Sequence, residues 1–324
     1  MPQVTRRYLL LRVVQIVPTI LGIVLISFVL VQAAPGDPVL ALAGEHGDQA
    51  YYREMRRHFA LDRPLPERFG IYVSRLATGD LGMSRIQGRP VAVIIAERIP
   101  ATLLLTVSAL LCSSLAGLLL GIVATLRRDG AVDLVTDMVT LGLHAAPVFW
   151  VGQISILVLA AGLGIFPVFG MRSTEPQAGG LPAALDVLVH LALPALVLTS
   201  QQLAGVARVT RQTLGRELDR DYVRAALAKG LPRGYVVVRH ALRLALLPVV
   251  TLVGHRMGYL LGGAVVVETI FGWPGLGTLL LSSLQSRDAP VVLGIFLLAA
   301  GAVVVANLVT DLTYGALDPR VRHG

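Results

Sequence analysis

Three residues in or beside one long apolar stretch have side chains that could act on a solute. Arg256 lies inside residues 244–267, and Glu268 and Trp273 follow that stretch. An arginine near the middle of a membrane helix costs about 2.5–3.5 kcal/mol on insertion scales, so it should face protein or water. We expect Arg256 either to line a transport pathway, where its charge would attract carboxylates, or to pair with Asp311 or Asp137. Glu268 and Trp273 are further pathway candidates.

The spacing of the other polar residues does not predict catalysis. The only lysine, Lys229, is not part of a phosphate-binding G-x-x-x-x-G-K-[ST] loop. No H-E-x-x-H or G-x-S-x-G pattern occurs, and the seven histidines have no metal-ligand spacing. The single cysteine, Cys112, allows neither an intrachain disulfide nor a cysteine-based metal site. We expect a protein that moves a solute or signals, with no catalytic residue, no metal site and no cofactor of its own.

The elements that must position these residues are membrane helices. Of the 324 residues, 55% are hydrophobic and 15% are charged, and the mean hydropathy is +0.72. Soluble domains carry about 25% charged residues, so this composition excludes a soluble enzyme and a nucleic-acid-binding domain despite the net charge of +8. Six apolar stretches could each cross a hydrocarbon core of about 30 Å. They are residues 10–33, 101–126, 134–163, 187–206, 244–267 and 291–312.

Basic residues beside these stretches predict the orientation of the chain. With a cytoplasmic N-terminus, sixteen of the 28 lysines and arginines flank the inner ends, whereas the two short outer loops hold one each. The fold predicted is an all-α membrane protein with six transmembrane helices and both termini in the cytoplasm. We divide it into an N-terminal helix region (1–34), an external helical cap (35–99), a five-helix core (100–312) and a cytoplasmic tail (313–324).

The long cytoplasmic segment 208–243, here called the inner loop, contains a short predicted helix. Asp221 can cap its start, Lys229 suits its negative end, and Gly230 with Pro232 ends it. A short helix flanked by basic residues suits contact with a cytoplasmic partner. The alternative is a connecting surface helix whose arginines bind anionic lipid.

The inner loop also carries a family resemblance. Residues 221–231 read D-Y-V-R-A-A-L-A-K-G-L, which resembles the coupling loop of ABC-importer permeases. Ala225, Ala226 and Gly230 match the general pattern, whereas Arg224 stands where that pattern has a glutamate. An arginine at this place is typical of the branch that serves dipeptides, oligopeptides and nickel.

Other blocks along the chain resemble the B-type permease subunit of that branch. They include A-P-G-D-P after the first stretch, R-I-P-A-T before the second, V-E-T-I-F-G-W-P-G-L-G after the fifth and L-D-P-R near the end. The resemblance covers nearly the whole chain in the expected order. It implies the fold of a type I ABC-importer permease in the bacterial plasma membrane.

The resemblance also implies partners. A second, homologous permease would complete the pathway, and two cytoplasmic ATPase subunits, separate or fused, would bind ATP and Mg. An extracytoplasmic binding protein would deliver the substrate, and membrane lipid would surround the helices. The residues that would contact the ATPase are Asp221, Tyr222, Arg224, Ala225, Ala226, Lys229 and Gly230.

Two glycine patterns have alternative interpretations. Gly254, Gly258 and Gly262 repeat at four-residue spacing, which gives a helix face for close packing within the chain or against the partner permease. The run 272–277, which includes Trp273, forms either a re-entrant turn at the outer mouth or a tight loop with an interfacial tryptophan.

The substrate class is the main choice left open. Peptide import is the leading hypothesis, and the same framework also serves nickel and glutathione. A gradient-driven secondary transporter is the alternative from a different class. It predicts inverted repeats and a midplane ion site, and no repeat of 20–50 residues is visible in the sequence.

Overall fold

The computed structural model describes residues 17–29, 50, 53–54, 62–127, 130–173 and 179–317, apart from the side chains of 132–133, 247, 255–263 and 310–317. Within this part of the chain the secondary structure is helical, apart from an isolated antiparallel bridge between Met83 and Pro90. The chain forms two compact units. Unit 1 contains Met1–Arg6, Pro100–Thr278 and Val303–Gly324, and unit 2 contains Arg7–Ile99 and Leu279–Ala302.

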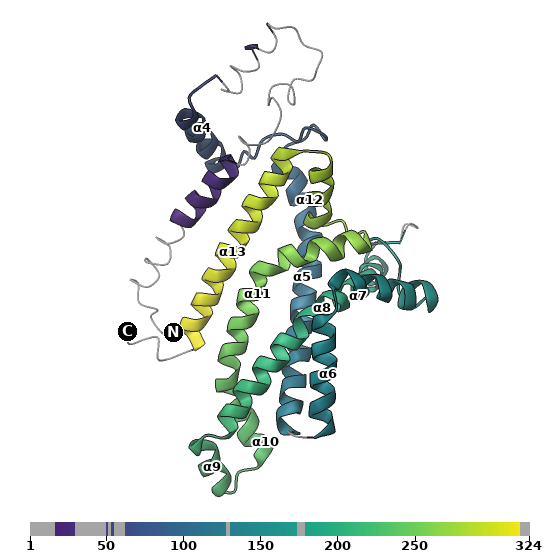
Figure 1. The fold of residues 1–324 in the computed structure, drawn as a ribbon, viewed down its shortest axis with the longest axis vertical. Coiled ribbons are helices and arrows are strands. Elements are labelled where there is room, and N and C mark those ends of the chain that lie inside the picture. The colour runs from purple at the N-terminus through teal and green to yellow at the C-terminus, as the bar shows by residue number, and fades with distance from the viewer. Residues whose placement is uncertain are drawn as a thin grey trace. The chain divides into compact units, whose positions relative to one another are not determined.

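The helices are drawn in Figure 1. An apolar helix covers Val17–Val29, and the labelled elements follow it. They are α4 (Leu65–Ala77), α5 (Val91–Leu126), α6 (Ala131–Ala145), α7 (Val148–Ser155), the π-helix η1 (Ile156–Gly162), α8 (Leu181–Leu218), α9 (Asp221–Ala228), α10 (Arg233–Val236), the π-helix η2 (Val237–Ala241), α11 (Leu242–Phe271), α12 (Leu276–Gln285) and α13 (Ala289–Leu317).

Helices occupy all six apolar stretches wherever the chain is described. Among the described residues, three helices are long and apolar enough to cross a membrane by themselves, and up to six spans result if each of three bent helix pairs counts as one. These six do not match the predicted stretches one by one, because Val17–Val29 is too short to count and two of the bent pairs involve the fifth stretch. The helices extend beyond the predicted stretches, because the sequence criterion stops at the first charged residues whereas a helix continues until its backbone bonding ends. Thus α8 has 38 residues and α5 has 36.

The third stretch is longer than one straight crossing needs and contains Pro147, and the structure breaks it at this proline. Its two halves, Leu134–Ala145 and Val148–Gly162, meet at an angle of 101°. Pro147 is the N-cap of α7 and has a ψ of 133°. A proline has no N–H to donate and disfavours the helical conformation of the residue before it, which explains why the helix breaks at this point.

Unit 1 is built around α8, which packs against α11, α6 and α7. Its closest crossing is with α5, where two glycines face α8. A Cβ at Gly121 would lie 2.5 Å from the Cβ of Thr210, and a Cβ at Gly117 would lie 2.7 Å from the Cβ of Val206. Only glycine allows the two backbones to come this close.

Unit 2 combines the first apolar helix with part of the predicted cap. Phe28 of that helix lies against two aromatic residues of α4, at ring-centroid distances of 5.3 Å to Phe69 and 5.7 Å to Tyr72. Asp288 accepts hydrogen bonds from the Ser84 hydroxyl and the Arg85 backbone N–H. Unit 2 thus ends at Ile99, as the predicted cap does, but it includes residues on both sides of position 34 and also Leu279–Ala302.

Candidate functional site at the inner loop

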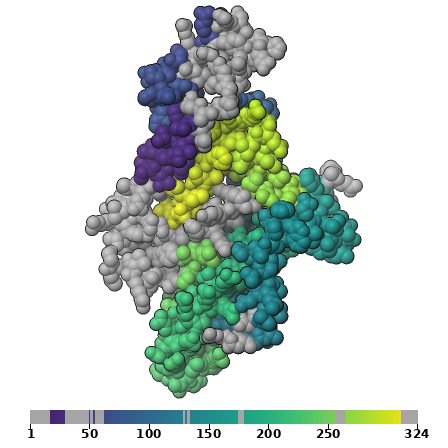
Figure 2. Space-filling view, in the orientation of Figure 1, coloured from purple at the N-terminus to yellow at the C-terminus, as the bar shows by residue number. Residues whose placement is uncertain are grey.

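The inner loop places a short helix, α9, at one end of unit 1, where it follows α8 and precedes α10 (Figures 1 and 2). Two backbone bonds close its C-terminus. The Gly230 N–H donates to the Leu227 carbonyl at 2.9 Å, and the Leu231 N–H donates to the Ala226 carbonyl at 3.4 Å. This pair of bonds is the Schellman motif, which needs a left-handed residue, and Gly230 supplies it with a φ of +81°. Gly230 thus ends α9, as predicted.

The start of α9 differs from the prediction. Its N-cap is Arg220, with no side-chain capping bond, and Asp221 is the first residue of the helix. The Asp221 carboxylate is fully exposed and lies 3.8 Å from the Arg224 guanidinium. Asp221 therefore acts as an acidic residue in the first turn, where the helix dipole favours negative charge, and it does not cap the helix.

One face of α9 is buried and the opposite face is exposed. Val223 and Ala226 are 2% and 9% exposed and pack with Leu214 of α8 and Val236 of α10. Among the predicted contact residues, Ala226 therefore holds the helix in place and is hardly accessible. The remaining six are exposed and available to a partner: Asp221, Tyr222, Arg224, Ala225, Lys229 and Gly230.

A hydrogen bond ties the start of α9 to the end of α8. The Tyr222 hydroxyl donates to Glu217 Oε2 at 2.9 Å. Partial burial and this bond to a carboxylate raise the pKa of Tyr222 to about 12. The hydroxyl therefore stays protonated at physiological pH and keeps donating to Glu217.

The exposed surface of the inner loop also contains apolar side chains that the sequence analysis did not select. They are Leu227, Leu231, Tyr235 and Val238, with exposed fractions of 39%, 37%, 51% and 67%. Helical spacing would not have identified Leu227, because it lies four residues after the buried Val223 and so on the same side of the helix. Apolar side chains among charged ones are typical of surfaces that bind another protein.

Glu268, a pathway candidate, is fully buried in unit 1 and organises the turn between α11 and α12. Its Oε2 accepts hydrogen bonds from the Gly277 N–H at 2.6 Å and the Thr278 N–H at 3.2 Å. The Thr102 hydroxyl donates to Glu268 Oε1 at 2.6 Å and accepts from the Leu276 N–H at 2.7 Å. The first three N–H groups of α12, which have no partner within the helix, are thereby satisfied.

The glycines of this turn are required by the same carboxyl group. A Cβ added at Gly275 would collide with the Glu268 carboxyl group, and one at Gly277 would collide with Val265 and approach Glu268 Oε2 to 2.9 Å. Gly272 has a φ of +59° and ends α11. The run 272–277 therefore forms a tight turn closed around Glu268.

Trp273 lies in the same turn and is also fully buried. Its indole N–H donates to the Ala101 carbonyl of α5 at 2.8 Å. Trp273 is therefore not an interfacial anchor, because such a tryptophan keeps its ring among lipid headgroups. In this conformation neither Trp273 nor Glu268 has surface with which to touch a solute, and both act as supports.

The side chain of Arg256, the third pathway candidate, is outside the described part of the structure, as is that of its suggested partner Asp311. The other suggested partner, Asp137 of α6, forms an ion pair with Arg211 of α8. The sequence analysis did not foresee this pair, because the two residues are 74 positions apart.

The glycine repeat of α11 is only partly described. Gly254 is half-buried, and the surroundings of Gly258 and Gly262 lie outside the described residues. The close helix crossing that the structure shows uses Gly117 and Gly121 of α5 instead. These two glycines have the same four-residue spacing, which was the signal that could have identified them.

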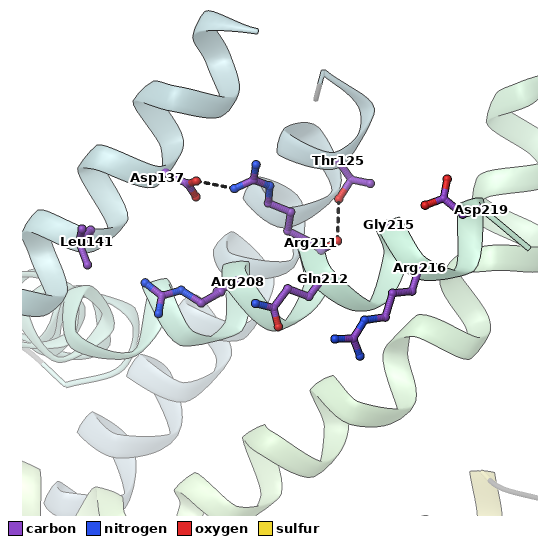
Figure 3. A pocket seen from close by; sticks show the side chains of 9 residues that line it. All are labelled: Thr125, Asp137, Leu141, Arg208, Arg211, Gln212, Gly215, Arg216 and Asp219. Carbon is purple, nitrogen blue, oxygen red and sulfur yellow. Dashed lines mark hydrogen bonds and ion pairs between the residues drawn. The ribbon is translucent and has the colours of Figure 1, made fainter. Parts of the chain in front are cut away.

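A cavity of about 590 Å³ lies between the end of α5, the middle of α6 and the first part of the inner loop, at the end of α8 (Figure 3). Arg208, Arg211 and Arg216 of α8 line it, with the acidic residues Asp137 and Asp219. The Asp137–Arg211 pair closes one side, and the Thr125 hydroxyl of α5 donates to the Arg211 carbonyl at 3.4 Å (Figure 3). The described residues contain no cluster of His, Cys, Asp or Glu suited to a metal ion.

Comparison with known proteins gives matches along nearly the whole chain. Residues 117–323 match the family model of the binding-protein-dependent transport system inner membrane component, and residues 5–106 match that of its N-terminal region. The di/tripeptide transport system permease protein DppB of Pseudomonas aeruginosa is 40% identical over 95% of this chain and 96% of its own length. The Escherichia coli K12 dipeptide permease DppB is 37% identical over 98% of this chain and 99% of its own length.

Two further matches are a glutathione permease and a solved methionine transporter. The glutathione transport system permease protein GsiC of Escherichia coli K12 is 35% identical, with 98% of this chain and 99% of that protein covered. The MetNI methionine ABC transporter, solved in inward-facing conformations, matches in fold with a TM-score of 0.55 at 17% identity, over 69% of this chain and 96% of that one. This match and the family models confirm the predicted type I permease fold, and the relatives confirm the predicted multi-pass location in the bacterial inner membrane. The chain belongs to the family of binding-protein-dependent transport system inner membrane components, as a permease subunit of the peptide branch of ABC importers.

Proposed function

We propose that this subunit forms half of a translocation pathway for dipeptides and tripeptides. The two DppB relatives, which transport such peptides by name, support this substrate class because each is aligned over at least 95% of this chain. Glutathione, itself a tripeptide, is the second candidate because GsiC is 35% identical over a similar length. The family membership argues against the gradient-driven alternative.

Coupling to ATP hydrolysis would take place at α9. The observation that carries this proposal is the exposed helix itself, which is fixed at its base by Val223 and Ala226 and closed by Gly230. Its outer surface offers both charged and apolar side chains, including Arg224, Lys229 and Leu227. A helix held in this way can transmit a displacement to α8 and α11, since it shares one buried cluster with the end of α8 and the start of α11.

Membership of the family of binding-protein-dependent transport components supports a set of partner proteins. Two cytoplasmic ATPase subunits, separate or fused, would bind ATP and Mg and receive α9, and a second permease would supply the other half of the pathway. An external binding protein would deliver the peptide. This chain has no nucleotide-binding motif of its own, so the energy for transport would come from those subunits.

Uptake by the reconstituted transporter tests the substrate class. The transporter and its binding protein would be placed in liposomes containing ATP, and uptake of a labelled dipeptide, labelled glutathione and Ni²⁺ would be compared. We expect the dipeptide to reach half-maximal uptake at a lower concentration than glutathione or Ni²⁺. We also expect its uptake to require both ATP and the binding protein. Uptake of Ni²⁺ alone would refute the peptide assignment, and preference for glutathione would support the second candidate.

Site-specific cross-linking tests the docking of α9. The single Cys112 would be replaced by serine, and cysteine would be introduced at Arg224 or, as a control, at Arg172 of the predicted outer loop. We expect Arg224→Cys, and not Arg172→Cys, to form a cross-link with the ATPase. Equal labelling of both sites, or none at Arg224, would contradict the assignment.

A further inference from the structure

The cavity beside the inner loop has the composition of a binding site for an anionic group. We propose that it binds the phosphate of an anionic phospholipid headgroup, with the acyl chains of that lipid lying along α6. Guanidinium groups form paired hydrogen bonds with phosphate and carboxylate oxygens, and a phospholipid headgroup is a phosphate that also brings an apolar tail. This role does not depend on the transported substrate.

The charge in the cavity favours an anion. Arg211 is already paired with Asp137. Arg208 and Arg216 are exposed on the same side of α8, and neither forms an ion pair with a residue in the described part of the chain. Figure 3 shows their side chains following one another along α8, with Gln212 between them. Asp219 is the remaining carboxylate in the lining, so two arginine cations face one acidic group.

The position of the cavity along α8 corresponds to the headgroup region of the bilayer. The part of α8 before Arg208 has 27 residues, counted from Leu181, which at 1.5 Å per residue gives about 40 Å of helix. That length already exceeds the hydrocarbon thickness of about 30 Å. A helix of this length that starts at the outer boundary of the hydrocarbon core reaches the inner headgroup region near Arg208.

The apolar wall of the cavity is continuous with an exposed face of α6. Leu141 lines the cavity and is 54% exposed, and Leu134 and Met138 on the same helix face are 59% and 63% exposed. A ligand that fits this surface needs an anionic head next to a long apolar tail. A phospholipid has both parts, whereas a hydrophilic dipeptide would leave the face of α6 without a partner.

The volume and opening of the cavity suit such a headgroup. About 590 Å³ lies within the roughly 300–1,000 Å³ range of small-ligand sites. An arginine near an anionic membrane surface contributes about 1 kcal/mol. Loss of two arginines should therefore weaken binding by about thirty-fold, since 1.4 kcal/mol corresponds to a factor of ten.

Lipid titration of the assembled transporter, followed by native mass spectrometry, tests the proposal. Phosphatidylglycerol, phosphatidylcholine with the same acyl chains, and inorganic phosphate would be added separately. We expect the wild type to retain phosphatidylglycerol in preference to phosphatidylcholine and the double variant Arg208→Gln/Arg216→Gln to lose about thirty-fold in affinity. Arg239→Gln removes an exposed charge of the inner loop that does not line the cavity, and it should change the affinity less than two-fold.

Photo-crosslinking of the wild type keeps the test valid if the double variant assembles poorly. A photoactivatable phosphatidylglycerol should label residues 134–141 or 208–219 in the assembled transporter. Unchanged lipid affinity in the double variant, or competition by inorganic phosphate equal to that of the lipid, would overturn the proposal. So would loss of labelling in the presence of a dipeptide, which would assign the cavity to the pathway, or labelling of the isolated chain only, which would show that a partner subunit covers the cavity.

Discussion

The turn between α11 and α12 and the inner loop both join helices, but their polar groups are used in opposite ways. In the turn, Glu268 and Trp273 are fully buried and their polar atoms bond to other parts of unit 1. In the inner loop, the charged side chains of Asp221 and Arg224 are mostly exposed and form an ion pair 3.8 Å long. The comparison distinguishes a region that fixes the fold from a surface that is available to a partner.

The glycines of the two regions differ in the same way. Gly275 and Gly277 are needed because neighbouring atoms leave no room for a Cβ, whereas Gly230 has no neighbouring atom within 4 Å and is needed for its left-handed backbone. Substitution should therefore damage packing in the turn and local helix geometry in the inner loop. The predictions that follow test this difference.

The largest effect is expected at Glu268. In Glu268→Ala the hydroxyl of Thr102 and the N–H groups of Gly277 and Thr278 lose their acceptor, and each buried donor left unpaired costs about 1–3 kcal/mol. We expect a loss of at least about 3 kcal/mol in unfolding free energy, seen as a lower thermal midpoint and a lower yield in detergent. Glu217→Ala at the inner loop is the control and should be mild; equal stability of the two variants would contradict the comparison.

A second large effect is expected at the α5–α8 crossing. Gly121→Ala places a methyl group 2.5 Å from the Thr210 Cβ and 2.7 Å from the Ala207 carbonyl oxygen. Overpacking of this kind costs about 1–3 kcal/mol. Gly142→Ala in α6 is the matched control, since no atom lies within 4 Å of the added group. Thermal unfolding of both variants should show destabilisation of the first alone.

At the inner loop, Gly230→Ala should affect coupling more than stability. The φ of +81° is unfavourable for alanine, and such strain costs about 1–2 kcal/mol locally. We expect the variant to be inserted and assembled, with reduced substrate-stimulated ATP turnover in liposomes. Gly234→Ala, which also adds a methyl group into open space but at an ordinary φ, should keep normal turnover. A fall of equal size in both variants would argue against a special role for Gly230.

The Asp137–Arg211 pair should contribute little to stability. Its side chains are 58% and 31% exposed, and exposed ion pairs contribute about 0–1 kcal/mol. Asp137→Asn is therefore expected to shift the thermal midpoint only slightly, with a smaller shift at high salt. A loss as large as that of Glu268→Ala would mean that this pair is sequestered in the assembled transporter.

The smallest effect is expected at Tyr222. Because its pKa is raised to about 12, the folded state favours the protonated hydroxyl. Any stability from this group is fully present below the unfolded pKa of about 10 and is lost as the pH rises through about 12. Comparison of the ultraviolet titration curves of the wild type and Tyr222→Phe should show one tyrosine that ionises last. A Tyr222 that ionises with the exposed tyrosines would indicate that its bond to Glu217 is not formed.

The amino-acid sequence was sufficient for the class of the protein and for the position of the short helix α9 in the inner loop. Long apolar stretches predict membrane helices because a helix satisfies its backbone hydrogen bonds within a single segment in lipid. The end of α9 was also predictable, since Gly230 and Pro232 act on the residues next to them. Such signals depend only on residues that are close in the sequence. They can therefore be recognised without knowing which parts of the chain pack against those residues.

The tertiary structure decided the roles of the buried and distant polar residues. Glu268 in an apolar context fits a pathway residue and a structural support equally well, and only the proximity of Thr102, 166 positions away, identifies the support. The pairing of Asp137 with Arg211 and the arginine-lined cavity likewise need helices from separate parts of the chain to meet. Sequence patterns report what a residue meets along its own helix, whereas the cost of burying a polar group depends on partners that only the folded chain brings within hydrogen-bonding distance.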